Sequence, residues 1–265
     1  MAKWSAAQQR RMLHENAILW RKYQEREGSG YLGLDFSLTS TGVVLLDNEG
    51  NLVRHEALTS AAKDGTTAER IATMTDSIQE ILSTTKPKVI AVESINVGTH
   101  VNSLLQLARV SGAVYQIILD NVKPPPYMLF CNVSSLKTAA TGDVKATKSH
   151  MLLEVFAKWG ERMDTDDEAD AFVAAKLGSK LDAFFNCYEK AISRSENIDD
   201  ALMEICKGRD KKFYSVLEEN GITQTEADAL LGIFTGSRKG GSGLNQMKEN
   251  DTEFYYEARK TLKEV

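Results

Sequence analysis

The sequence predicts an α/β protein with a mixed five-stranded sheet and helices on both faces of that sheet. Short apolar runs of strand length recur between residues 31 and 131. Amphipathic stretches of helical period separate the later runs, and this alternation is typical of helices packed against a sheet. The first three runs instead follow one another across short turns, so the third is expected to pair back on the second. The predicted element order is therefore β-β-β-α-β-α-β-α.

Each predicted strand is a run of apolar or β-branched residues bounded by turn residues. The fourth run, KVIAVE after Pro87, is apolar almost throughout, which is typical of a parallel strand buried on both faces. The five predicted strands cover residues 31–37, 42–47, 51–58, 88–93 and 127–131.

The predicted helices carry apolar residues three and four positions apart. In the first of them, for example, Ile71, Met74 and Ile78 fall on one side. The predicted helices of this region cover residues 66–84, 101–121, 134–140, 145–159 and 167–190.

Two helical extensions flank this region. Residues 4–26 form a predicted amphipathic helix that ends at the Gly28-Ser29-Gly30 break. The polar residues after 190 show helical patterns at 198–207, 211–219, 224–234 and 250–263. We therefore expect an N-terminal helical arm (1–30), an α/β domain (31–190) and a C-terminal helical appendage (191–265).

The composition argues against several classes of protein. The net charge of −5 disfavours a generic nucleic-acid coat protein, although lysines are enriched in residues 121–160. Three cysteines without CxxC spacing exclude a disulfide framework and predict a reducing, cytoplasmic location. The sequence has no apolar run of about 20 residues and no Walker-type glycine loop, so we expect neither membrane association nor a nucleotide cofactor.

Two carboxylates lie at the ends of apolar strands. Asp35 is set in GLDFS, and Glu93 ends the run VIAVE. If these two strands are neighbours, both acids emerge at the same edge of the sheet, where they repel each other unless a divalent cation lies between them. The alternative is that each acid caps its strand or pairs with a lysine.

A third acidic element precedes the last helix of the α/β domain. Asp167 and Asp170 are three residues apart and share a helix face, but Asp166 and Asp170 also share one, so the partner of Asp170 stays open. The alternative is an acidic helix cap, which the helix dipole favours. With Asp35 and Glu93, these oxygens suit two Mg²⁺ ions, for which Mn²⁺ is a substitute.

The acids, in this order along the chain, resemble those of the RuvC-type Holliday junction resolvases of the RNase H-like superfamily. The resemblance rests on Asp35 with the following SLTSTG, on the AVE motif of Glu93 and on the DEADA motif at 167–171. The segment KTAATG at 137–142, with the lysines after it, is similar to the family's segment before its last acidic pair. The resemblance covers about residues 31–180, and the two extensions suggest a divergent or phage-encoded member.

The resemblance implies an endonuclease that cuts four-way or branched double-stranded DNA with paired nicks. Asp35 would bridge two metal ions, Glu93 and Asp170 would each complete one ion's shell, and Asp167 would lie beside them. Lys148 would stabilise charge on the phosphate in the transition state. Because a four-way junction has two-fold symmetry, a homodimer is expected.

Further contacts with DNA are expected from basic residues. Lys137 and Lys145 would hold the DNA backbone. Arg10 and Arg11 of the N-terminal arm would bind DNA, or else the arm would brace a partner subunit through Trp4, Leu13 and Trp20. The helix at 101–121 has more apolar surface than one sheet face needs, so part of it forms a dimer contact, a junction-facing surface or plain core.

Three other functions stay open. After Glu93 the stretch SINVG at 94–98 lacks the aromatic residue with which the familiar bacterial resolvase probes the junction centre, which leaves the junction-centre contacts and the sequence preference open. Because the same layout of acids also serves other RNase H-like nucleases, one of these is the first alternative. GLDFSLTSTG also resembles the first phosphate loop of actin-like ATPases, and a non-catalytic junction-binding module is the third. The histidines have no ligand spacing and are given no role; they are His14, His55, His100 and His150.

Overall fold

The structure, a computed structural model, describes residues 5–24, 27–95 and 101–235. Its strands are β1 (Tyr31–Asp35), β2 (Ser40–Leu46), β3 (Leu52–Thr59), β4 (Val89–Glu93) and β5 (Tyr127–Cys131). They form one five-stranded sheet of order β3-β2-β1-β4-β5. β2 is antiparallel to β1 and β3, whereas β1, β4 and β5 are parallel to one another. The predicted mixed sheet is confirmed.

The helices follow the predicted order with small shifts at their ends, except that two helices replace the one predicted for residues 167–190. None of the described helices is long and apolar enough to cross a membrane. The helices are α1 (Ala6–Gln24), the short 3-10 helix η1 (Ala62–Asp64), α2 (Thr67–Thr84), α3 (Val101–Asn121), α4 (Val133–Thr141), α5 (Lys148–Trp159), α6 (Asp166–Ser179), α7 (Leu181–Ser193), α8 (Ile198–Cys206), α9 (Lys211–Glu219) and α10 (Gln224–Thr235).

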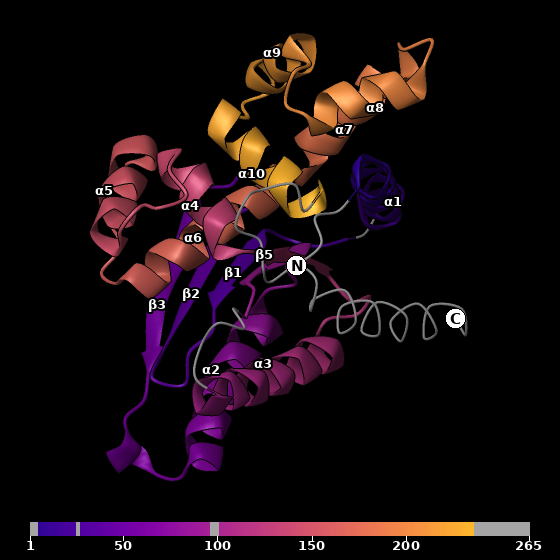
Figure 1. The fold of residues 1–265 in the computed structure, drawn as a ribbon. Helices are drawn as coiled ribbons and strands as arrows, with labels where there is room; N and C mark the ends of the chain where they lie inside the picture. Colours follow the sequence, from indigo (N-terminus) through magenta and orange to yellow (C-terminus); the bar gives the residue numbers. More distant parts are fainter. Residues whose placement is uncertain (1–4, 25–26, 96–100, 236–265) are drawn as a thin grey trace.

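Helices cover both faces of the sheet, as Figure 1 shows. On one face α2 and α3 pack against the alternate strand residues that include Leu32, Ile90 and Met128. On the other face α6 crosses β1, β2 and β4, and its apolar residues pack with Val44 and Leu129. The central strands β1 and β4 are buried on both faces, which explains why their sequences are apolar rather than alternating.

Two glycines allow α6 to lie directly on the backbone of the sheet. A Cβ atom at Gly33 of β1 would lie 1.9 Å from the carbonyl oxygen of Ala171. A Cβ atom at Gly42 of β2 would lie 2.1 Å from the carbonyl oxygen of Asp167. Because no side chain fits at either position, the glycines set the height of the first turns of α6 above the sheet.

The single helix predicted for residues 167–190 is wrong, because α6 ends at Ser179 and α7 begins at Leu181. The break follows Gly178-Ser179, a pair of weak helix formers at which helices commonly bend. After the break, α7 buries Phe184 and Phe185 against aromatic side chains of other helices. Tertiary packing therefore decides the change of direction.

A second correction concerns the helix that was predicted to begin at residue 145. It begins at Lys148, because Thr147 is its N-cap and accepts a hydrogen bond from the His150 N–H at 3.2 Å. Lys145 lies in the preceding turn, where its N–H donates to Asp143 Oδ1 at 2.9 Å. The helix predicted at 250–263 lies outside the described residues.

The helical extensions pack on the α6 side of the sheet. Leu13 and Trp20 of α1 are 0% and 1% exposed, and they share one hydrophobic cluster with Phe213 and Phe234 near the other end of the described chain. These two side chains are therefore not available to brace a partner subunit, and Trp4 lies outside the described residues. The division into arm, α/β domain and appendage stays a prediction.

Lys158 of α5 joins the C-terminal helices to the α/β region. Its Nζ donates to the Ala139 carbonyl at 2.7 Å and to Thr225 Oγ1 at 3.0 Å. It also lies 4.0 Å from the buried carboxylate of Glu226. Burial lowers the pKa of Lys158. The Lys158 side chain thereby links α5 to both α4 and α10.

The contact between α6 and the sheet predicts that Gly33→Ala destabilises the fold. The added methyl group must push β1 and α6 apart, so we expect the free energy of unfolding to fall by about 3 kcal/mol. Urea denaturation measures this change. In Gly112→Ala of α3 a Cβ would meet nothing within 4 Å, so this control should gain about 0.5–1 kcal/mol. A Gly33→Ala protein as stable as the wild type would contradict the close packing.

Candidate metal centre

Two of the predicted acids lie side by side at strand ends. Asp35 is the last residue of β1, and Glu93 is the last residue of β4. The two strands are parallel neighbours whose register pairs Leu34 with Val92, so the next position of each strand carries a carboxyl group. Both side chains are half-buried and lie on the face of the sheet that α6 covers.

The third acid comes from α6. Asp170 lies one turn into this helix, whose start is fixed by the Thr165 N-cap. One oxygen from each of Asp35, Glu93 and Asp170 lies within 4.8 Å of the other two. We call these residues the acid triad. Oδ1 of Asp170 is buried and has no hydrogen-bond partner, so an acceptor atom within the triad is left for a bound group.

Burial, with the negative charges nearby, raises the pKa values of all three triad carboxyls. Burial, followed by the charges of Glu93 and Asp170, raises the pKa of Asp35 to about 9. Burial and the neighbouring aspartates raise the pKa of Glu93 to about 8. Burial, with the charge of Asp166, raises the pKa of Asp170 to about 6. A divalent cation would favour the ionised forms, and these all-oxygen donors suit a hard ion.

Two aspartates at the start of α6, Asp166 and Asp167, lie outside the triad but act on its charges. Asp166 forms an ion pair with Lys148, and its charge raises the pKa of Asp170. Asp167 lies outside the triad, but its charge raises the pKa values of Asp35 and Glu93. Both aspartates therefore add negative charge to the triad.

Two of the predicted lysines act on the triad electrostatically. Lys148, at the start of α5, lowers the pKa values of all three triad carboxyls. Lys137 of α4 does the same for Glu93 and Asp170. The hydrogen bond from Lys148 to Asp166 raises the pKa of Lys148 itself, so its ammonium group stays charged.

The predicted DNA-binding arginines lie on α1 and are engaged in ion pairs. Arg10 Nε lies 3.6 Å from Asp199 of α8. Arg11 Nε lies 2.8 Å from Glu15, one turn along α1. Their role in binding DNA stays a prediction, as does that of Lys145, which lies in the exposed turn before α5.

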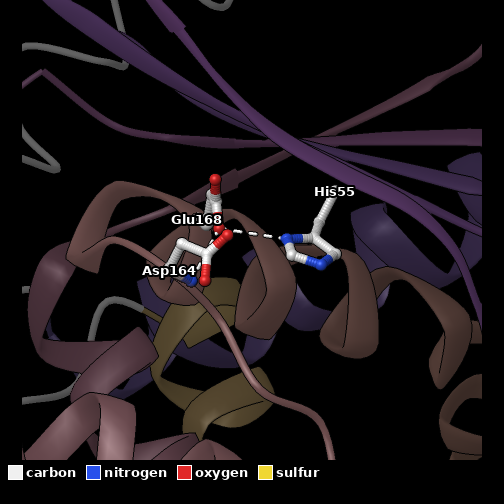
Figure 2. Close-up of side chains that lie close together, drawn as sticks. All are labelled: His55, Asp164 and Glu168. Carbon is white, nitrogen blue, oxygen red and sulfur yellow. Dashed lines mark hydrogen bonds and ion pairs between the residues drawn. The ribbon is translucent and has the colours of Figure 1, made fainter.

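A second polar cluster was missed by the sequence analysis. Ligand atoms of His55, Asp164 and Glu168 lie within 4.8 Å of one another, and Figure 2 shows the three side chains. The Thr165-x-x-Glu168 spacing is a capping-box pattern that marks Glu168 as a helix-start residue. No sequence signal links it to His55, more than 100 residues earlier, because strand pairing creates that contact.

A family model described as crossover junction endodeoxyribonuclease RuvC matches residues 31–176. The chain belongs to the RuvC family. The match includes all three residues of the triad and leaves out α1 and α7–α10. Membership of this nuclease family sets aside the alternative of an actin-like ATPase.

Bacterial RuvC proteins share the matched part of the chain. The RuvC protein of Azoarcus sp. is 34% identical over 148 residues, which are 54% of this chain and 78% of that protein. The protein of Aromatoleum aromaticum is 31% identical over 148 residues, which are 54% of this chain and 77% of that protein.

A solved RuvC structure shares the fold. It is Thermus thermophilus RuvC in complex with Holliday junction substrate, with a TM-score of 0.50 and 21% identity. The similarity covers 56% of this chain and 91% of that one. The RuvC fold is confirmed.

The raised pKa values predict how stability depends on pH without metal. The folded protein holds protons on the triad more tightly than the unfolded chain, whose carboxyls titrate near pH 4. The stability that these protons contribute is complete below about pH 4 and is lost progressively as the pH rises to the folded-state pKa values of about 6 to about 9. We therefore expect the melting temperature in EDTA to fall between pH 6 and pH 9.

Asp35→Asn should reduce this loss. Removing the repulsion should raise the free energy of unfolding at pH 9 by about 1–2 kcal/mol and the melting temperature by about 2–8 °C, since 1 kcal/mol corresponds to about 2–4 °C in a chain of this size. Scanning calorimetry at several pH values measures the effect. Asp76→Asn, on the exposed side of α2, is the matched control and should change nothing. A wild-type melting temperature that rises with pH would contradict the prediction.

Proposed function

We propose that this chain is a metal-dependent endonuclease that resolves four-way (Holliday) or other branched DNA junctions by paired nicks. The observation that carries the proposal is the acid triad, because three carboxyl groups from distant segments meet in a half-buried site of a RuvC-family chain. Such an arrangement is unfavourable without a cation and is suited to phosphodiester hydrolysis with one.

The proposed cofactor is a pair of Mg²⁺ ions, for which Mn²⁺ can substitute. Asp35, Glu93 and Asp170 would hold the ions, with Asp167 beside them. When bound, such ions supply a nucleophile at neutral pH and stabilise the leaving oxygen. The chain's own contribution is to hold the carboxylates together and to leave Oδ1 of Asp170 as an open acceptor.

Basic residues near the triad are proposed to bind the substrate. The Lys148 side chain is 75% exposed and its charge acts on every triad carboxyl, so it is placed to offset negative charge on a reacting phosphate. Lys137 would contact the DNA backbone nearby. Lys145, Arg10 and Arg11 are proposed as further backbone contacts away from the triad.

The substrate and the assembly are proposed together. Related proteins are named crossover junction endodeoxyribonucleases, and the T. thermophilus relative was solved with a Holliday junction substrate. Two nicks in opposed strands need two active sites related by a two-fold axis, which a homodimer supplies. The first turns of α3 leave Val101 and Leu105 71% and 50% exposed, an apolar surface that suits such a contact. A cytoplasmic location belongs to the same proposal.

The helices outside the family match are proposed to brace the nuclease region. α1 packs against α7, α8 and α10, and α10 packs against α4. Because α4 and α5 carry Lys137 and Lys148, this support would keep both lysines in position beside the triad.

Asp35→Asn and Asp170→Asn should abolish cleavage of a four-way junction in Mg²⁺ while binding persists. Metal stabilisation is worth several kcal/mol, so we expect the rate to fall at least about 1,000-fold. Removing negative charge does not weaken phosphate binding. Cleavage on both strands of a labelled junction, with binding followed by gel shift, measures the two effects.

Asp76→Asn is again the control and should cut at the wild-type rate. Either triad variant cutting normally would refute the assigned site. Flaps, replication forks, plain duplexes and RNA–DNA hybrids belong in the same assay, because preference for one of them over the junction would identify a different RNase H-like nuclease.

Lys148→Ala should slow cleavage more than it weakens junction binding. Loss of one preorganised charge from a reacting site lowers the rate by about 100- to 1,000-fold. Single-turnover rates at saturating enzyme, set beside the dissociation constant, separate the two roles. An equal loss in rate and affinity would place Lys148 among the residues that only position the DNA.

A further inference from the structure

One partly buried polar contact joins the edge strand β3 to the first turn of α6. His55 Nδ1 lies 3.0 Å from Glu168 Oε2, as Figure 2 shows. The same oxygen accepts the N–H of Asp164 at 2.9 Å, and the Glu168 N–H donates to Thr165 Oγ1 at 3.2 Å. The side chain of Glu168 is only 4% exposed, so this acid is tied at once to β3 and to its own helix start.

The contact lies next to the triad without belonging to it. Glu168 and Asp170 are two residues apart on α6 and therefore point to different sides of the helix. His55 pairs with Val44 in the sheet register, and Val44 is buried under α6, so His55 stands on the covered face of β3. The first turn of α6 thus has β3 on one side and the triad on the other.

The rotation of this turn decides where Asp170 points. The missing Cβ atoms of Gly33 and Gly42 let α6 lie close to the sheet, because a Cβ there would lie 1.9 Å from the Ala171 carbonyl oxygen and 2.1 Å from the Asp167 carbonyl oxygen. These two approaches lie over β1 and β2 and set the distance between the helix and the sheet. The bond to His55 on β3, to one side of them, opposes a roll of the helix about its own axis.

We propose that His55 is a positioning residue whose hydrogen bond to Glu168 fixes the rotation of α6 and holds Asp170 within reach of Asp35 and Glu93. This inference rests on the proposed function in one respect, because it takes the acid triad as the metal-binding site. Hydrogen-bond partners behind a metal ligand commonly change metal affinity by about 10- to 100-fold, and His55 acts one step further back, through the helix.

The test is Mn²⁺ binding to the whole chain, measured by isothermal titration calorimetry. His55→Ala should weaken binding by about 10-fold or more. His55→Asn, whose amide nitrogen takes the place of Nδ1 and can still donate to Glu168, should recover most of the affinity. The matched control is His150→Ala on α5, which removes a histidine 3.2 Å from Glu154 and should leave binding unchanged.

A second readout separates positioning from general damage. In His55→Ala the Mn²⁺ concentration for half-maximal junction cleavage should rise by the same factor as the dissociation constant, with the rate at saturating Mn²⁺ near that of the wild type. Melting temperatures in EDTA show that each variant is folded. A loss of rate that excess Mn²⁺ does not restore would contradict the proposal.

The outcomes distinguish this proposal from the proposed function. Wild-type affinity in His55→Ala, or equal losses in His55→Ala and His55→Asn, would overturn the positioning role and leave the triad in place. Absence of Mn²⁺ binding in the wild type would overturn both. A last outcome would make His55, Asp164 and Glu168 a metal site themselves. If the Asp35→Asn variant still binds one Zn²⁺ ion and the His55→Ala variant does not bind that ion, the positioning role is wrong.

Discussion

The close seating of α6 on the sheet is the constraint on which the rest of the structure depends. Gly33 and Gly42 leave room for the helix backbone where any side chain would collide with Ala171 or Asp167. This approach brings Asp170 down to the level of the strand ends that carry the other two acids. Without it the same residues would form a helix over a sheet, but no shared site.

The close packing of α6 on the sheet also brings three carboxyl groups together in a half-buried site. The fold compensates only part of their mutual repulsion. The triad carboxyls keep raised pKa values, and one oxygen of Asp170 has no protein partner. Lys148 and Lys137 offset some of the repulsion from outside. Unfavourable electrostatics of this kind commonly mark functional sites, because a ligand supplies what the fold lacks. Membership of the RuvC family agrees with that interpretation.

The strand ends could be predicted from the sequence because the signal is local. An acid that terminates an apolar run must emerge at the sheet edge, and this holds for Asp35 and Glu93. The end of α6 was predicted wrongly, because Gly178-Ser179 is only a weak local signal and the packing of α7 decides that the chain turns near residue 180. The link between His55 and Glu168 depends on strand pairing across the sheet, which no spacing in the sequence encodes.

The contacts of the Lys158 ammonium group limit how far the chain can be shortened. A fragment trimmed to the family-matched residues would keep every carboxylate of the triad and the Ala139 carbonyl, but it would lose Thr225 and Glu226. It would also uncover the apolar residues of α4 against which α10 now packs. A minimal catalytic fragment of this enzyme therefore has to retain the later helices or to replace the apolar side chains that they shield.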